Sequence, residues 1–151
     1  RLLNLNLKEN LLIASYTLKG DEVQKSIEEV LEYFPIVKSY YHRKANTLSG
    51  GERQMLAMAM ALLRKPRIML FDEPTANLSP KLALQVLNEL VKLRDNYGIT
   101  VVLVEQNARR ALERGDKAVL FFGGKIMFEG KPSELLEHSE LGSLYLGLKE
   151  A

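Results

Sequence analysis

Up to residue 65 the apolar side chains recur every three or four positions, which is the period of amphipathic helices. Asn6 and Glu9 have the spacing of a capping box and predict that a first helix begins here. Its apolar positions are Leu7, Leu11, Leu12 and Ala14. After a break at Gly20, a second helix is predicted to carry an apolar stripe and to end at Pro35, which cannot continue the helical hydrogen bonds. That stripe consists of Val23, Ile27, Val30, Leu31 and Phe34.

From Pro66 onward the pattern changes to short apolar runs that alternate with amphipathic segments. The run at 68–71 is uninterrupted and flanked by charge, which is typical of a strand buried on both faces. Residues 99–104 predict a second such strand, because they are rich in β-branched side chains. Between them, residues 82–93 predict an amphipathic helix, with an apolar face of Leu82, Val86, Leu90 and Leu93. Strand–helix–strand order implies parallel pairing and an α/β fold.

The last part of the chain predicts a short helix, a hairpin and two closing helices. The helix is expected over 108–114, and a strand over 118–122. Gly123-Gly124 is typical of a two-residue turn that leads into a hairpin partner at 125–129. The closing helices are expected over 133–137 and 141–148.

Composition and charge exclude several classes of function. The chain contains no cysteine, which excludes disulfides and thiolate metal sites, and its only histidines are His42 and His138. The formal net charge of +2 is too small to indicate a nucleic-acid partner. No apolar run approaches the roughly 18–20 residues of a membrane span. The basic cluster at 42–44 follows a segment compatible with a short helix, and we interpret it as solvated surface rather than a ligand site.

The first segment with a chemical character is Leu48-Ser49-Gly50-Gly51-Glu52-Arg53-Gln54, at the start of a predicted helix. Ser49 can cap this helix and Glu52 can complete a capping box. Capping alone does not explain two glycines in the first turn, since each glycine lowers the stability of the helix by about 1 kcal/mol relative to alanine. Glycines permit close approach to the backbone, and the free N–H groups favour an anion such as phosphate. A plain capped helix and a phosphate site both stay open here. The apolar face of the helix is Met55, Met58, Ala59 and Leu62.

The second such segment places two carboxylates directly after the strand at 68–71. Ligands of open α/β sheets bind at the carboxyl ends of strands. Asp72 at that position can hold Mg²⁺, and Glu73 can polarise an attacking water. Because successive positions of an extended backbone point to opposite sides, Asp72 and Glu73 are expected to face different ligands. The alternative is a strand that simply ends in two solvated acids before Pro74.

Taken together, LSGGERQ at 48–54, LFDEP at 70–74 and TANLS at 75–79 resemble the ATP-binding cassette (ABC) ATPase family. The order of the motifs and their separation agree with that family, and the resemblance extends to the C-terminal hairpin and helices. It implies an α/β fold with a helical subdomain and the C-terminal part of a P-loop NTPase (RecA-like) parallel-sheet core. Residues 1–65 would be the helical, signature-bearing subdomain. Residues 66–151 would be the C-terminal half of the nucleotide-binding core, with its Walker B strand.

The resemblance also implies roles for individual residues. Ser49, Gly50 and Gly51 would contact the γ-phosphate of an ATP held by the partner subunit of a head-to-tail dimer. Asp72 would serve Mg²⁺, and Glu73 would be the general base. The nucleotide-contacting and interface positions implied are Leu48, Ser49, Gly50, Gly51, Glu52, Gln54, Asn77 and Ser79. The family usually has aspartate where Ser79 stands, in the loop that crosses the dimer interface.

Gln106 stands where the family has its switch histidine, two residues beyond the strand at 99–104. Glutamine can donate a hydrogen bond to a phosphate oxygen, but it cannot carry a proton as imidazole does. We predict a catalytic, orienting role for Gln106, the alternative being a plain polar strand end. The stretch VLVEQNARRAL at 102–112 resembles the second ATPase subunit of branched-chain amino acid importers.

A phosphate-cradling loop, G-x-x-x-x-G-K-S/T, is missing from the sequence. The nearest candidate, residues 124–132, has five residues between its glycines, a proline in place of the hydroxyl, and a hairpin before it. The chain begins with Arg1. We therefore expect a C-terminal fragment that lacks the Walker A segment and the preceding glutamine loop.

The resemblance implies the ATP-hydrolysing motor subunit of an ABC transporter, with ATP and Mg²⁺ as cofactors. It would pair with a second ABC ATPase subunit, as a homo- or heterodimer, and with transmembrane permease subunits at the cytoplasmic face of the cell membrane. No nucleic-acid partner is expected. The alternatives are an ABC-type ATPase of a non-transport system and an inert fragment. Sustained heptads, which repair and chromosome members carry, are absent.

Overall fold

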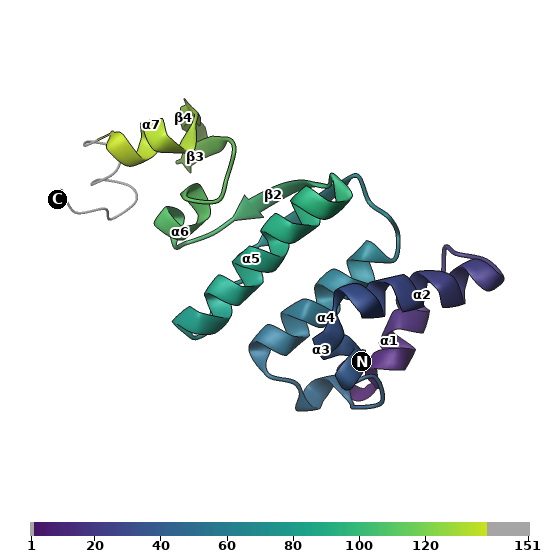
Figure 1. The fold of residues 1–151 in the computed structure, drawn as a ribbon. Helices are drawn as coiled ribbons and strands as arrows, with labels where there is room; N and C mark the ends of the chain where they lie inside the picture. Colours follow the sequence, from purple (N-terminus) through teal and green to yellow (C-terminus); the bar gives the residue numbers. More distant parts are fainter. Residues whose placement is uncertain (1, 139–151) are drawn as a thin grey trace. The chain divides into compact units, whose positions relative to one another are not determined.

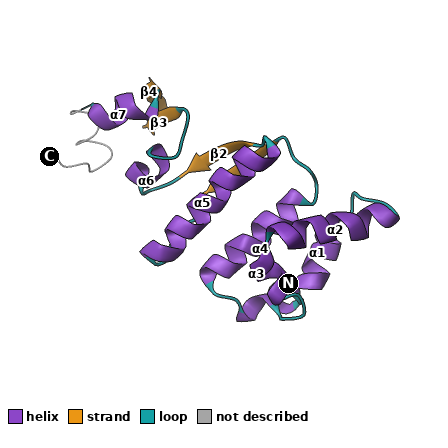
Figure 2. Cartoon of the chain, viewed as in Figure 1, coloured by secondary structure: helices purple, strands orange, loops and turns teal. Residues whose placement is uncertain are grey.

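The chain forms two compact units, residues 1–102 and residues 103–151, of which the computed structural model describes residues 2–138. Helices dominate the first unit, and the second contains a small hairpin (Figures 1 and 2). The helix predicted over 141–148 lies outside the described residues. The subdomain boundary expected near residue 65 stays a prediction.

Helices make up the first unit as far as residue 62, as the apolar period predicts (Figure 1). They are η1 (Leu2–Asn4), α1 (Leu7–Ala14), α2 (Asp21–Tyr33), α3 (Pro35–Ser39), η2 (Ala45–Thr47) and α4 (Gly50–Leu62). The expected stop at Pro35 is confirmed, and the same proline occupies the first turn of α3. The segment at 36–44, for which a short helix was one possibility, consists of the rest of α3 followed by turns.

The predicted capping box of α1 is present. The side chain of Asn6 accepts a hydrogen bond from Glu9 N at 2.8 Å, and the Glu9 carboxylate accepts one from Asn6 N at 2.8 Å. Leu7, Leu11 and Ala14 are buried, but Leu12 is 43% exposed. Including Leu12 in the apolar face was wrong, because that face of this short helix is narrower than the run of apolar residues.

The core of the first unit is built around α4. This helix contacts α1, α2, α3 and α5, and its four predicted apolar positions are all buried. From α2, the predicted residues Ile27, Val30 and Phe34 are buried as well. The ring of Tyr33 meets that of Tyr97 edge-on, with centroids 5.0 Å apart, and so links α2 to α5.

Two strands and a long helix complete the first unit and continue into the second. They are β1 (Ile68–Asp72), α5 (Pro80–Tyr97) and β2 (Thr100–Val104). The two strands are neighbours in one sheet, as expected for a β–α–β unit. α5 is longer than the predicted 82–93, because Ser79 caps its start and Gly98, at φ 62°, ends it.

The strands are not buried on both faces, which corrects the sequence-based expectation. Met69 is 5% exposed, whereas Ile68 and Leu70, on the opposite face of β1, are 59% and 76% exposed. Val102 of β2 is 47% exposed. Within residues 2–138, one face of this sheet therefore lacks the cover that a parallel strand pair requires.

The second unit contains α6 (Ala108–Leu112), β3 (Ala118–Phe122), β4 (Lys125–Gly130) and α7 (Pro132–Glu137). β3 and β4 pair antiparallel, and the turn residues Gly123 and Gly124 have φ of 55° and 76°. The predicted hairpin is thus confirmed, with the left-handed turn that two glycines favour. The glycine-rich candidate at 124–132 is largely β4 itself, which agrees with its rejection as a phosphate loop.

The α/β fold class is confirmed by this arrangement. Among residues 2–138 no helix is long and apolar enough to span a membrane.

One structural polar residue was not anticipated. Asn10 is only 2% exposed, and its side-chain amide donates to the carbonyl oxygens of Leu2, Leu5 and Asn6 at 3.0, 3.3 and 2.9 Å. It therefore ties η1 to the start of α1.

Replacing Asn10 with leucine should lower the free energy of unfolding by about 1–3 kcal/mol, because the carbonyl oxygens of Leu2, Leu5 and Asn6 each lose a side-chain donor and keep only a backbone one. A urea titration followed by circular dichroism measures this change. Asn4→Ala, at an exposed position of η1, is the matched control and should leave the midpoint unchanged. An equal effect of both variants would contradict a structural role for the Asn10 amide.

Candidate functional site

The start of α4 is fixed by a capping box, as predicted. Ser49 N donates to the Glu52 carboxylate at 2.7 Å, and the Ser49 hydroxyl accepts from Glu52 N at 3.4 Å. The hydrogen bond from Ser49 N is the main reason that the pKa of Glu52 is lowered. Leu48 is buried and its carbonyl accepts from the Arg53 guanidinium, whereas Gln54 is half-buried. The loop before the helix is therefore held firmly in place.

This capping leaves backbone donors at the helix start. Within residues 2–138, Gly50 N and Gly51 N make no hydrogen bond, as expected for the first turn of a helix. Both lie at the positive end of a 13-residue helix. An anion placed there would receive two N–H donors and the helix dipole, which is the chemistry of a phosphate site.

The same glycines have a second role that sequence reasoning missed. A Cβ atom on Gly50 would lie 2.6 Å from Cδ2 of Leu78, and one on Gly51 would lie 3.3 Å from Cδ2 of Leu82. The glycines therefore also allow the loop before α5, and α5 itself, to approach α4. An apolar residue directly before the N-cap Ser79 was the available sequence signal for Leu78.

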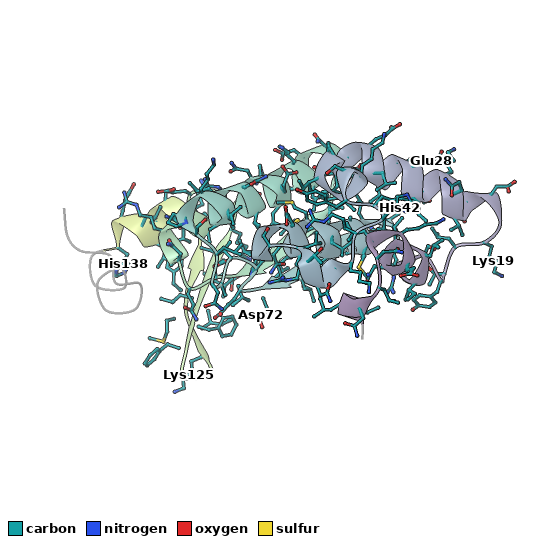
Figure 3. The ribbon with its side chains drawn as sticks, turned by 90° about the horizontal axis from the view of Figure 1, so that it is seen from below. Lys19, Glu28, His42, Asp72, Lys125 and His138 are labelled. Atoms are coloured by element: carbon teal, nitrogen blue, oxygen red, sulfur yellow. The ribbon has the colours of Figure 1, made fainter. Side chains whose placement is uncertain are left out.

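The two carboxylates after β1 are placed differently from each other. Asp72 is the last residue of the strand and is exposed, and Figure 3 shows where its side chain lies. Glu73 is half-buried and has a left-handed backbone, with φ of 46°. The expected alternation of an extended backbone was therefore wrong for Glu73, because the strand ends one residue earlier.

The loop at 75–79 connects the acid pair to α5 through two tight turns. Ala76 N donates to Glu73 O at 3.0 Å, and Leu78 N donates to Thr75 O at 3.2 Å. Asn77 is exposed with φ of 59°, a conformation that asparagine tolerates well. Ser79, also exposed, caps α5 by accepting from Leu82 N at 3.4 Å. Serine and aspartate are both good N-caps, so the local structure accommodates Ser79.

Gln106 belongs to the second unit and follows β2 on a bend. Its side chain is exposed, and its carbonyl accepts from Ala108 N at 2.9 Å. The next residue, Asn107, caps α6. Gln106 is thus at a strand end beside a helix start, as predicted, while Ser49–Gly51 and the acid pair all lie in the first unit.

The residues present fit Mg²⁺ and a nucleotide phosphate. Residues 2–138 contain no group of three or more His, Cys, Asp or Glu side chains suited to a metal ion. Mg²⁺ does not require one, because it is usually bound by one or two carboxylates with water and phosphate oxygens. The Asp72 carboxylate, which has no hydrogen bond or ion pair within the described chain, is suited to that role.

Comparison with known proteins agrees with these features. Residues 2–76 match the family model described as "ABC transporter". The chain is 50% identical over 145 residues to a protein of Archaeoglobus fulgidus described as "Probable branched-chain amino acid transport ATP-binding protein LivF". It is 39% identical over 143 residues to high-affinity branched-chain amino acid transport ATP-binding protein BraG of Pseudomonas aeruginosa. These alignments cover 96% and 95% of the chain but only 61% of each relative.

A solved structure shows the same fold. The ADP conformation of MJ1267, an ATP-binding cassette of an ABC transporter, superposes with a TM-score of 0.83 at 26% identity. The alignment covers 97% of this chain and 64% of that protein. The sequence motifs, the family model and the shared fold agree, and the chain belongs to the ABC transporter ATP-binding family.

Proposed function

We propose that this chain is the signature and Walker B part of an ATP-hydrolysing motor subunit of an ABC transporter. The observation that carries the proposal is the start of α4. Its capping box leaves Gly50 N and Gly51 N as donors to an anion, next to a loop that connects to an acid pair. The two relatives described above, both named as transport ATP-binding proteins, support it.

In this proposal the start of α4 acts on an ATP bound by the partner subunit. Ser49, Gly50 and Gly51 would contact its γ-phosphate, while Leu48, Glu52 and Gln54 hold the helix start in shape. Asn77 and Ser79 would meet the partner across the dimer interface, where both are exposed to do so. Preorganised N–H donors stabilise charge without reorganisation, which is how they would accelerate phosphoryl transfer.

The acid pair is proposed to act on the ATP of its own subunit. Asp72 would hold Mg²⁺, and when bound the ion would offset charge on the phosphate oxygens. Glu73 would orient and deprotonate the attacking water, because it is half-buried at the end of a fixed strand. Gln106 would donate a hydrogen bond that orients the γ-phosphate or this water, without carrying a proton.

The exposed face of the sheet supports a larger cassette. Ile68 and Leu70 are more than half exposed, and the chain spans 61% of the length of the two relatives described. We propose that the remaining part of the subunit covers this face and supplies the phosphate-binding loop. Residues 1–65 would then act as the helical subdomain, and residues 66–151 as part of the nucleotide-binding core.

For the transported substrate we propose a branched-chain amino acid, on the names of those two relatives. The partners would be a second ABC ATPase subunit, as a homo- or heterodimer, and transmembrane permease subunits. The subunit would be peripheral, at the cytoplasmic face of the cell membrane.

Ser49→Arg in the full-length subunit should lower ATP turnover by about 10²–10³-fold, because a bulky side chain blocks the donors of α4. Nucleotide affinity of the isolated subunit should be unchanged, since the blocked site belongs to the partner. Phosphate release and equilibrium nucleotide binding measure the two quantities. Asn46→Arg, exposed three residues before, is the control. A strong loss of affinity in the monomer would contradict action across subunits.

Glu73→Gln should lower turnover by about 10²–10⁴-fold while ATP binding and the closed dimer persist, because only the general base is lost. Phosphate release and gel filtration with ATP measure both effects. Glu137→Gln, an exposed carboxylate of α7, should leave them unchanged. The 151-residue chain alone should release no phosphate. Mg²⁺-dependent release from it that disappears in Glu73→Gln would contradict that expectation.

Gln106→Ala should lower turnover by about 2- to 10-fold, the loss expected for one orienting hydrogen bond. Gln106→His should preserve or raise turnover, since imidazole can also donate to a phosphate oxygen. Steady-state kinetics on the full-length subunit measure both, with Gln85→Ala on the exposed side of α5 as control. Unchanged turnover in Gln106→Ala would show that this side chain takes no part in the reaction.

A further inference from the structure

The contact between Leu78 and Gly50 has no role in the function proposed so far. Leu78 lies in the loop after the acid pair and is half-buried. Its Cδ2 atom fills the space that a Cβ on Gly50 would need, since the two would be 2.6 Å apart. Leu78 is therefore the side chain by which this loop rests on the start of α4.

Hydrogen bonds hold the loop on both sides of Leu78, toward the acid pair and toward α5. Toward the acid pair, the hydrogen bonds from Leu78 N to Thr75 O and from Ala76 N to Glu73 O leave little freedom. Toward α5, the cap by Ser79 fixes the next residue. Two turns, each closed by one of these hydrogen bonds, thus separate Leu78 from the backbone of Glu73.

We propose that Leu78 is a positioning residue that holds Glu73 and the donors of Gly50 and Gly51 in a fixed relation. The inference rests on the proposed function. There, Glu73 serves the ATP of its own subunit, and the start of α4 serves the ATP of the partner. Leu78 touches neither nucleotide, and its contact joins the two sites mechanically within one subunit.

The chemistry of the contact explains why these two residue types occur together. An apolar side chain on a bare glycine backbone makes a short contact without charge or hydrogen bonds. Adding a methyl group at Gly50 displaces Leu78, whereas shortening Leu78 leaves a gap. Both changes together restore the packing between the loop and α4, because the new methyl group at position 50 occupies the space that the leucine side chain leaves.

The test is a double-mutant cycle in the full-length subunit with Gly50→Ala, Leu78→Ala and the double variant. In Leu78→Ala, kcat should fall by about 2- to 30-fold and the Hill coefficient for ATP should fall toward unity. Nucleotide affinity should stay unchanged. The double variant should recover in kcat, in cooperativity and in urea midpoint relative to both single variants, and Leu78→Met should remain close to the wild type.

Leu82→Ala is the matched control, because Leu82 meets the neighbouring Gly51 from the first turn of α5 and not from the loop. It should lower the urea midpoint without changing the Hill coefficient. If Leu78→Ala keeps the kcat and the Hill coefficient of the wild type, or if the losses in the double variant are additive, the positioning role of Leu78 is overturned. The proposed function is not affected by either result. A wild-type subunit without Mg²⁺-dependent turnover would instead refute the proposed function.

Discussion

The packing of α4 is the constraint on which the first unit depends. One face of this helix is buried against α1, α2 and α3, and its glycine start receives side chains from the α5 region. In the proposed function the same start also keeps two backbone N–H groups available to an anion. A capping box achieves both, because Ser49 and Glu52 satisfy each other and leave the donors of Gly50 and Gly51 unused. Within one helical turn, the Ser49 and Glu52 atoms stabilise the helix start, and the N–H groups of Gly50 and Gly51 are left for a ligand.

Elements governed by local rules could be predicted from the sequence. The capping box at Asn6 and Glu9, the stop at Pro35, the glycine turn at 123–124 and the buried stripe of α4 all follow from spacing and residue type. Features set by tertiary contact could not. Asn10 is an example, since nothing in the pattern marks an asparagine inside α1 as a buried donor to three carbonyl groups.

The sheet shows the limit of arguments from apolar runs. A run such as Ile68–Phe71 indicates that both faces of a strand are suited to burial, but it does not say what covers them. In this chain Met69 is covered and Leu70 is not. The sequence pattern therefore indicates that both faces of the strand are suited to apolar cover. The exposed fractions show how much of that cover residues 2–138 provide. The difference between the two indicates an unsatisfied apolar surface, which is the physical basis for proposing a larger cassette.

The acid pair shows why the candidate site was only partly predictable. Glu73 was expected to continue the alternation of the strand, because successive positions of an extended backbone point to opposite sides. Its φ of 46° is instead left-handed, a conformation that costs about 1–3 kcal/mol and persists only when neighbouring contacts impose it. The hydrogen bond that Glu73 O accepts from Ala76 N is such a contact, and in our proposal the anchoring of Leu78 on Gly50 is another. The backbone conformation of Glu73 therefore belongs to the turn that follows the strand, and the alternation within the strand does not indicate it.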